Sequence, residues 1–308
     1  MQTVTFNAIE KLDFRTKESY KTLRTNLEFS GKDRRGISVT SSTPNEGKTS
    51  VSFQLAISIA EGGKKVILVD ADLRKSVLKG RYKSNASRYG LSHYLSGQAS
   101  ISEICCKTNI PNFYVIFSGP VPPNPSELLG NDAFELLLEY LRKEYDYVIV
   151  DTPPLGSVID GAVAAQHCDG TVIVIESGAI SYKFAQKVKE QLEKVDCRIL
   201  GVILNKVNMS GKGYYGAYYG KYYGKYYGKY YGNDDEGGLH AAVVQKGTKA
   251  AKAVKGDTGE RSHEGKNGSG SGKEKGLEEN GYPEDDMIQL DIDMVQLVED
   301  TETIEELK

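Results

Sequence analysis

Residues 42–49 read STPNEGKT and follow a short β-branched run, GISVTSS. They match the phosphate-binding loop pattern G-x-x-x-x-G-K-[ST], except that Ser42 stands at the first glycine position. In such a loop, backbone N–H groups and the N-terminus of the next helix converge on phosphate oxygens. The helical pattern TSVSFQLAISIAE follows directly, as this geometry requires. The alternative is a turn that contains GKT by chance. If the segment is a phosphate loop, the chain must contain a buried strand, this loop and a helix in direct succession.

The same alternation of strand and helix patterns continues through the first 210 residues. Segments with helical spacing separate the apolar runs VILVDAD, NFYVIF, YDYVIVD, GTVIVIE and RILGVILN. Strands this short and this continuously apolar are buried on both faces, and strands that alternate with helices form parallel βαβ units. We therefore predict an α/β fold with a doubly wound, mostly parallel sheet of the P-loop NTPase type. Its ligand site should lie at the carboxyl ends of the strands.

The composition changes sharply near residue 210. Residues 1–212 are predicted to form the P-loop domain, including an N-terminal amphipathic helix. Residues 213–232 contain ten tyrosines in five pairs, and a glycine follows every pair. Glycine opposes helix and strand, so the tyrosines are either a cluster of chemical acceptors or an adhesive low-complexity segment. Residues 233–308 are basic and then acidic and are predicted to be disordered; helical spacing is nevertheless present at Met287, Leu290, Met294 and Leu297.

Charge and cysteine content argue against several classes of protein. The formal net charge is −3, and neither charged segment has the interleaved aromatic residues of a nucleic-acid-binding face. The four cysteines include no C-x-x-C pair and the chain opens without a secretion signal, which predicts reduced thiols. No apolar run approaches the ~20 residues of a membrane span. We expect a cytoplasmic protein that reaches the inner face of a membrane only through a partner.

Carboxylates follow two of the predicted strands. Asp70 ends VILVD, Asp72 comes two residues later, and Asp151 ends YVIVD. Because the carboxyl ends of parallel strands meet at one edge of a sheet, these side chains should lie near the phosphate loop. There they can bind Mg²⁺ or accept a proton. One such aspartate is commonly a helix N-cap, but two sites flanking a GKT loop are seldom both caps.

These motifs, in this order, resemble those of the bacterial tyrosine kinase (BY-kinase) family. The matching segments are SSTPNEGKT (Walker A), VILVDADLR (the additional Walker A′ of the family), VIVDTPP (Walker B), SGPVPPNPSELL and the tyrosine cluster. The resemblance covers residues 15–232. It implies an ATP-dependent protein-tyrosine kinase that phosphorylates its own cluster in trans. The implied phosphoacceptors are Tyr214, Tyr215, Tyr218, Tyr219, Tyr222, Tyr223, Tyr226, Tyr227, Tyr230 and Tyr231.

The resemblance implies that the chain uses ATP and Mg²⁺. Lys48 would bind the β- and γ-phosphates, and Asp151 would reach the metal through water. The other implied metal ligands are Thr49 and Asp72. The implied nucleotide contacts are Asn45, Glu46, Gly47, Lys48, Thr49, Ser50 and, at the adenine edge, Asn205.

Two catalytic roles besides that of Lys48 are also implied by the resemblance. Asp70 would be the base that takes the proton from an incoming tyrosine, because a phenol is still protonated at pH 7. Arg74 would stabilise the transferred charge, and a surface salt bridge is the alternative for this residue.

The family also carries an E-x-x-R-x-x-R helix that packs subunits into a ring. The corresponding segment here is ESYKTLR, in which Glu18 and Arg24 match. Lys21 replaces the first arginine and lacks its bidentate geometry. An ordinary solvated helix face is the alternative. The resemblance further implies a membrane adaptor that activates the kinase, a cognate tyrosine phosphatase, and regulation of capsular or extracellular polysaccharide synthesis.

The alternative function is that of a P-loop ATPase of the partitioning and division-positioning type, which acts as a nucleotide-switched scaffold. Those proteins typically carry a second lysine early in the loop, as K-G-G-x-G-K-T. This chain has Thr43 at that position. Arg74 in the Walker A′ segment and the tyrosine cluster also favour the kinase.

Overall fold

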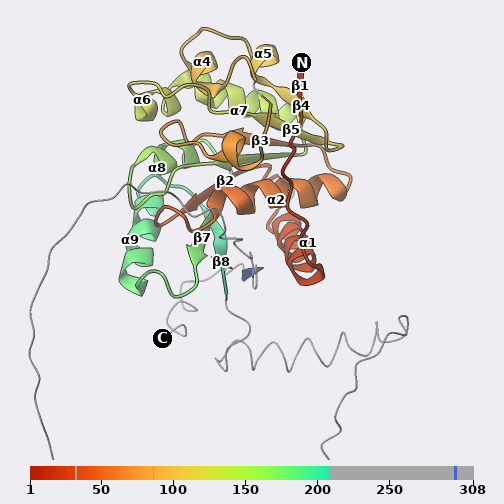
Figure 1. The fold of residues 1–308 in the computed structure, drawn as a ribbon. Helices are drawn as coiled ribbons and strands as arrows, with labels where there is room; N and C mark the ends of the chain where they lie inside the picture. Colours follow the sequence, from red (N-terminus) through yellow and green to blue (C-terminus); the bar gives the residue numbers. More distant parts are fainter. Residues whose placement is uncertain (32, 86, 208–294, 297–308) are drawn as a thin grey trace, which may run out of the picture. The chain divides into compact units, whose positions relative to one another are not determined.

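One sheet organises the described part of the chain (Figure 1). The computed structural model describes residues 1–31, 33–85, 87–207 and 295–296, which all belong to one compact unit. The strands are β1 (Gln2–Val4), β2 (Gly36–Ser41), β3 (Val66–Asp70), β4 (Cys106–Thr108), β5 (Phe113–Ile116), β6 (Tyr147–Asp151), β7 (Gly170–Glu176), β8 (Ile199–Asn205) and β9 (Val295–Gln296). Their order across the sheet is β1-β4-β5-β3-β6-β2-β7-β8-β9.

The centre of the sheet is parallel. All neighbours from β5 through β3, β6, β2 and β7 to β8 pair in parallel. Antiparallel pairs occur between β4 and β5 and between β8 and β9. The apolar runs that we predicted as strands form β3, β5, β6, β7 and β8. The predicted α/β fold with a doubly wound, mostly parallel sheet is therefore confirmed.

Helices cover both faces of the sheet (Figure 1). Side chains of β3 alternate between the faces: Val66 and Leu68 pack in the cluster that contains α1 and α2, whereas Ile67 and Val69 pack in the cluster that contains α7. Burial on both faces explains why the run is continuously apolar. The helices are α1 (Phe14–Phe29), α2 (Lys48–Glu61), α3 (Leu78–Arg81), α4 (Leu91–Leu95), α5 (Ile101–Ile104), α6 (Pro125–Leu129), α7 (Asp132–Glu144), α8 (Asp160–Ala165) and α9 (Tyr182–Glu193).

Several short elements are not apparent from the sequence. β1, β4 and α3 to α5 have three to five residues each, too few for a hydrophobic period to show. Val295 and Gln296 form β9 against β8. The other residues of 233–308 lie outside the described ranges, so the disorder of that segment stays a prediction. The tyrosine cluster at residues 213–232 lies outside the described residues, as do Met287, Leu290, Met294 and Leu297.

The described residues bear on two further expectations. None of the helices in the described ranges has both the length and the apolar content needed to span a bilayer. All four cysteines are free thiols, as we predicted; Cys105, Cys106 and Cys197 are buried and Cys168 is partly buried. Burial raises the pKa of the Cys105 thiol to about 12, so it is unreactive at neutral pH.

Candidate active site

The phosphate loop connects β2 to α2, as the sequence predicted. Gly47 has a φ of 91° and Asn45 a φ of 69°, both in the left-handed region. Glycine has no Cβ to oppose this conformation, and asparagine tolerates it better than most residues. The Val51 N–H donates to the Gly47 carbonyl at 2.9 Å and opens the hydrogen-bond ladder of α2. The N–H groups of residues 47–50 have no acceptor within the helix, which makes this end suitable for phosphate oxygens.

The side chain of Glu46 forms hydrogen bonds within the phosphate loop and to the end of β7. Its buried carboxylate accepts the Thr43 N–H at 2.6 Å and, more weakly, the Glu176 N–H at 3.4 Å. Burial raises the pKa of this carboxyl, although the hydrogen bonds oppose the shift. The side chain of Glu46 thus fixes the shape of the loop, and the contact of this residue with the nucleotide stays a prediction.

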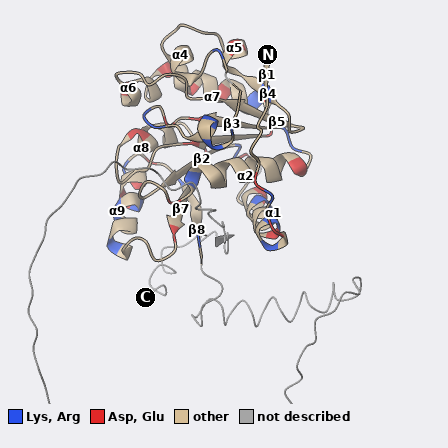
Figure 2. Cartoon of the chain, in the orientation of Figure 1, with Lys and Arg blue, Asp and Glu red and all other residues tan. Residues whose placement is uncertain are grey.

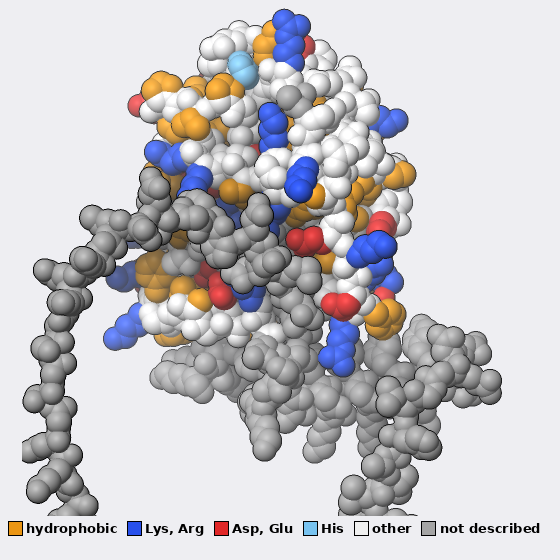
Figure 3. Space-filling model, in the orientation of Figure 1, with side chains coloured by type: hydrophobic (Ala, Val, Ile, Leu, Met, Phe, Trp, Pro, Cys, Tyr) orange, Lys and Arg blue, Asp and Glu red, His pale blue; other side chains and the backbone are white. Residues whose placement is uncertain are grey.

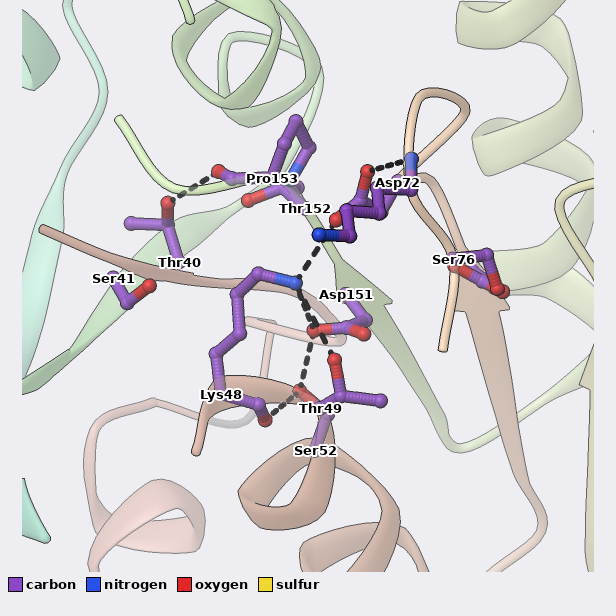
Figure 4. Close-up of polar contacts among 12 residues, drawn as sticks. Thr40, Ser41, Lys48, Thr49, Ser52, Asp72, Ser76, Asp151, Thr152 and Pro153 are labelled. Atoms are coloured by element: carbon purple, nitrogen blue, oxygen red, sulfur yellow. Dashed lines mark hydrogen bonds and ion pairs between the residues drawn. The ribbon is translucent and has the colours of Figure 1, made fainter. Parts of the chain in front are cut away.

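Lys48 lies among the predicted metal ligands (Figure 4). Its Nζ is 3.3 Å from Asp72 Oδ2, 3.7 Å from Asp151 Oδ1 and 3.3 Å from Thr49 Oγ1. The Ser52 hydroxyl donates to Asp151 Oδ1 at 3.3 Å and steadies that carboxylate. Burial alone would lower the pKa of Lys48, but attraction to Asp151 and Asp72 outweighs it and raises the pKa. Lys48 is therefore a buried ammonium ion.

The groups around this ammonium ion fit Mg²⁺. Thr49 supplies a hydroxyl oxygen, and Asp72 and Asp151 supply carboxylate oxygens, which are the hard donors that Mg²⁺ prefers. The Lys48 ammonium already occupies a cation position among them. Within the described residues, no three His, Cys, Asp or Glu side chains gather closely enough to hold a metal by themselves. This is expected for an ion that takes its remaining ligands from phosphate and water.

Asp70 is a buried carboxylate with one unpaired oxygen. It ends β3 and pairs in register with Asp151 at the end of β6. The Ser76 hydroxyl donates to its Oδ2, whereas its Oδ1 has no hydrogen-bond partner among the described residues. Burial and then repulsion from Asp151 raise the pKa of Asp70 to about 7. A desolvated carboxylate with a free oxygen is well suited to accept a proton.

Arg74 forms a bidentate ion pair with Asp160. Its Nε is 2.7 Å from Oδ2 and its Nη2 is 3.0 Å from Oδ1. Asp160 is buried and also accepts the Ser126 hydroxyl at 2.6 Å. Burial would raise the pKa of Asp160, but the hydrogen bonds from Arg74 and Ser126 lower it. The salt-bridge alternative thus describes Arg74 in this structure, and its role in phosphoryl transfer stays a prediction.

Asn205 ends β8 and is fully buried behind the phosphate loop. Its Nδ2 donates to the Glu46 carbonyl at 2.8 Å, but its Oδ1 has no hydrogen-bond partner among the described residues. A buried acceptor without a donor lowers stability. The exocyclic amino group of adenine could supply that donor. The adjacent Lys206 binds the Asn45 carbonyl and the Glu176 carboxylate, both at 2.9 Å.

Six of these contributors were missed by the sequence reasoning: Glu176, Lys206, Ser52, Ser76, Ser126 and Asp160. Glu176 ends β7, so the rule that identified the other strand-end carboxylates could have found it. Lys206 directly follows β8 and carried no motif. Ser76 lies in the segment that connects β3 to α3, and Asp160 is the first residue of the short helix α8. Neither position carries a sequence pattern, so only their tertiary contacts reveal them.

The loop after β6 packs against the phosphate loop and forms backbone hydrogen bonds with it. The Leu155 N–H donates to the Ser41 carbonyl at 2.8 Å, and the Gly156 N–H donates to the Ser42 carbonyl at 2.9 Å. A Cβ at Gly156 would overlap the Ser42 carbonyl oxygen and would lie 2.6 Å from the ring of Phe184 in α9. Only glycine therefore allows this close approach.

We expect Gly156→Ala to destabilise the protein by about 1–3 kcal/mol, because the added methyl group must displace the phosphate loop or α9. Nucleotide affinity should fall as well, because the displaced loop carries the phosphate-binding N–H groups. Urea unfolding and nucleotide titration measure the two effects. Gly80→Ala is the matched control, since a Cβ there meets nothing within 4 Å. Equal stability of the two variants would contradict this account of the loop.

The predicted oligomer contacts lie on or near the surface of α1. Lys21 Nζ is 2.6 Å from Glu18 Oε1, and both side chains are substantially exposed. Arg24 donates to the Ser58 carbonyl of α2 at 2.6 Å and so ties the two helices together. Each of the three side chains therefore has a partner within the chain, and their contribution to a ring stays a prediction.

Comparison with known proteins supports one family. A family model described as AAA domain matches residues 35–203. Tyrosine-protein kinase CpsD of Streptococcus agalactiae is 45% identical over 200 residues, which cover 65% of this chain and 87% of that protein. Tyrosine-protein kinase YwqD of Bacillus subtilis is 38% identical over 204 residues, with coverages of 65% and 86%. The solved kinase domain of Escherichia coli tyrosine kinase ETK matches with a TM-score of 0.59 and 37% identity, over 61% of this chain and 74% of that one.

The fold and the phosphate loop define a P-loop protein of the α/β class. The chain belongs to the bacterial tyrosine kinase family. The predicted family and the predicted enzyme class, a protein-tyrosine kinase, are thereby confirmed. The alternative of a partitioning-type ATPase scaffold has less support, since these relatives are kinases by name.

Proposed function

We propose that the chain is an ATP-dependent kinase that phosphorylates the tyrosines of residues 213–232, in trans between copies. The observation that carries this proposal is the buried Asp70 carboxylate, whose Oδ1 has no hydrogen-bond partner in the described part of the chain. Asp70 lies beside Asp151 at the strand ends, and Asp151 pairs with Lys48 of the phosphate loop. These positions support a site in which Asp70 would accept a proton and Lys48 would bind phosphate.

The transfer follows from these positions. Asp70 Oδ1 accepts the phenol proton as the tyrosine oxygen bonds to the γ-phosphorus of ATP. The bond from that phosphorus to the bridging oxygen breaks, and ADP leaves with the bridging oxygen. Lys48 and the N–H groups at the start of α2 hold the phosphates and offset their charge. Mg²⁺ held by Thr49, Asp72 and Asp151 would supply further charge neutralisation. Asn205 Oδ1 would accept a hydrogen bond from the adenine amino group.

The resemblance to the bacterial tyrosine kinases also implies how copies of the chain would assemble and how the kinase would be regulated. Copies would form a ring through α1, and a membrane adaptor would activate the kinase and hold it at the inner face of the membrane. Each phosphate adds roughly −1.5 to −2 charges at pH 7, so a heavily modified ring would repel itself and separate. A cognate tyrosine phosphatase would restore it. This cycle would regulate capsular or extracellular polysaccharide synthesis.

Mass spectrometry of the purified chain after incubation with Mg·ATP tests the function. We expect phosphotyrosine within residues 213–232. For the trans step, a Lys48→Met chain with intact tyrosines is mixed with an active chain whose ten cluster tyrosines are changed to phenylalanine. The inactive chain should become modified. ATP hydrolysis without any phosphotyrosine, even with an adaptor segment present, would instead favour the scaffold alternative.

A further inference from the structure

A cavity of about 280 Å³ opens beside the candidate active site. Its lining comes from the segment after β3 and from residues 87–93 and 117–120. Ser76 lines the cavity, and the hydroxyl of the same Ser76 donates to Asp70. The cavity thus adjoins the proposed catalytic base, yet no residue of the phosphate loop lines it. None of the roles described above uses it.

The surroundings of this cavity are basic. Residues 73–102 contain six Lys and Arg residues and no Asp or Glu. Figure 2 shows Lys and Arg along the segment that follows β3, and Figure 3 shows them spread over the face in view. Lys79 and Arg88 line the cavity, and none of its described lining residues is acidic. Neither of the two forms an ion pair with a described carboxylate. Their charges are therefore available to an anion.

The cavity walls combine aromatic surface with hydrogen-bond donors. Phe117 and Tyr89 line it, and the guanidinium carbon of Arg88 lies 5.0 Å from the centroid of the Tyr89 ring. This contact holds the guanidinium against an aromatic face. His93 Nδ1 accepts the Gly90 N–H at 3.2 Å, so the neutral ring carries its proton on Nε2 as a donor. The walls can therefore contact both an aromatic ring and an anionic group.

Two glycines join the walls. A Cβ at Gly90 would overlap the backbone of Gly119, which itself has a φ of 82°. The Leu91 N–H donates to the Phe117 carbonyl at 2.7 Å and fastens the same two segments together. Backbone contacts therefore hold two walls of the cavity together without a ligand.

We propose that this cavity binds a phosphotyrosine side chain of the kind that residues 213–232 would carry after modification. Arg88 and Lys79 pair with the phosphate, and Phe117 and Tyr89 pack against the phenyl ring. The volume lies at the small end of ligand pockets and suits one side chain. The unmodified segment carries three lysines, which the basic walls repel, whereas each phosphate reverses the local charge.

Retention of one phosphotyrosine would keep the adjacent tyrosines of the same segment near Asp70. Their effective concentration rises, so modification of one tyrosine would favour modification of the next. The ligand in this inference rests on the proposed function. Its test does not, because a synthetic phosphopeptide requires no kinase activity.

Fluorescence anisotropy with two labelled peptides tests the site. Both have the sequence GKYYGKYYG, and one carries a single phosphotyrosine; the protein is the full unmodified chain. We expect the phosphopeptide to bind at least about tenfold more tightly than the unmodified peptide. Arg88→Ala should weaken its binding about tenfold or more, since a charge-assisted contact is lost. Arg81→Ala, which removes the same charge from the same basic segment but not from the cavity wall, should change it less than about twofold.

Competition and fold controls separate the outcomes. Phenyl phosphate should displace the phosphopeptide at a concentration at which inorganic phosphate does not. Arg88→Lys should bind with intermediate affinity, because lysine keeps the charge but loses the planar fork; it also replaces Arg88→Ala if that variant fails to fold by circular dichroism. Equal binding of the two peptides overturns the proposal, as does an equal loss in Arg88→Ala and Arg81→Ala. Binding to anionic lipid vesicles that depends on Arg88, without any phosphopeptide preference, would assign the surface to a membrane instead.

Discussion

Asp70→Asn should lower the rate of phosphotyrosine formation by about 10²–10⁴-fold, the usual contribution of a general base. The affinity for ATP should stay within about threefold, because the hydrogen bond of Asp70 is to Ser76 and the ion pairs of Lys48 are to Asp72 and Asp151. Lys48→Met should lose activity by a different route. It removes the ammonium group that contacts the predicted metal ligands and would bind the phosphates, so nucleotide affinity should fall as well.

Quantitative phosphotyrosine detection and nucleotide titration on the same preparations measure both effects. Asp33→Asn is the matched control, since it makes the same chemical change at an exposed position outside the site. Normal autophosphorylation by Asp70→Asn would refute its assignment as the base. Equal loss of ATP affinity in the Asp70 and Lys48 variants would show that Asp70 acts on nucleotide binding instead.

Asp70→Asn should also stabilise the protein without nucleotide and metal, and by an amount that depends on pH. Folding raises the pKa of Asp70 from 3.8 to about 7. The contribution of Asp70 to the stability of the folded state is therefore fully present below pH 3.8 and is lost as the pH rises through 7. At about 1.4 kcal/mol for each pKa unit, the buried carboxylate costs the folded state on the order of 4 kcal/mol at pH 8. We expect a gain of about 2–4 kcal/mol at pH 8 that falls below about 1 kcal/mol near pH 4.

Urea unfolding in EDTA at both pH values measures this gain, with Asp33→Asn as the surface control. Lys48→Met should shift stability the other way at pH 8, by about 3 kcal/mol, because it leaves buried carboxylates without their cation. Changes of opposite sign in the free energy of unfolding would show that the two variants act through the buried charges. A general loss of packing would destabilise both. A gain in Asp70→Asn that is the same at pH 8 and pH 4 would contradict the raised pKa of Asp70.

Much of the fold followed from local patterns. The runs VILVD and YVIVD are apolar up to their terminal aspartates, because helices cover both faces of the sheet. This pattern predicted β3 and β6 together with their buried surroundings. The phosphate loop was predictable for a similar reason: its glycine, lysine and threonine act through positions fixed within a few residues. The short elements between β3 and β5 could not be predicted, since a single turn of helix shows no period.

The sequence by itself determined where the candidate side chains stand along the chain: Lys48 in the phosphate loop, and Asp70 and Asp151 at the ends of predicted strands. Only the tertiary structure decided that β3 lies next to β6, which sets Asp70 against Asp151 and raises its pKa. The tertiary structure also supplied the partners Ser76 for Asp70 and Asp160 for Arg74. The physical reason is the separation along the sequence of the residues that interact. Local patterns report the environment of a segment, whereas strand order and contacts between connecting segments depend on crossovers that join distant parts of the chain.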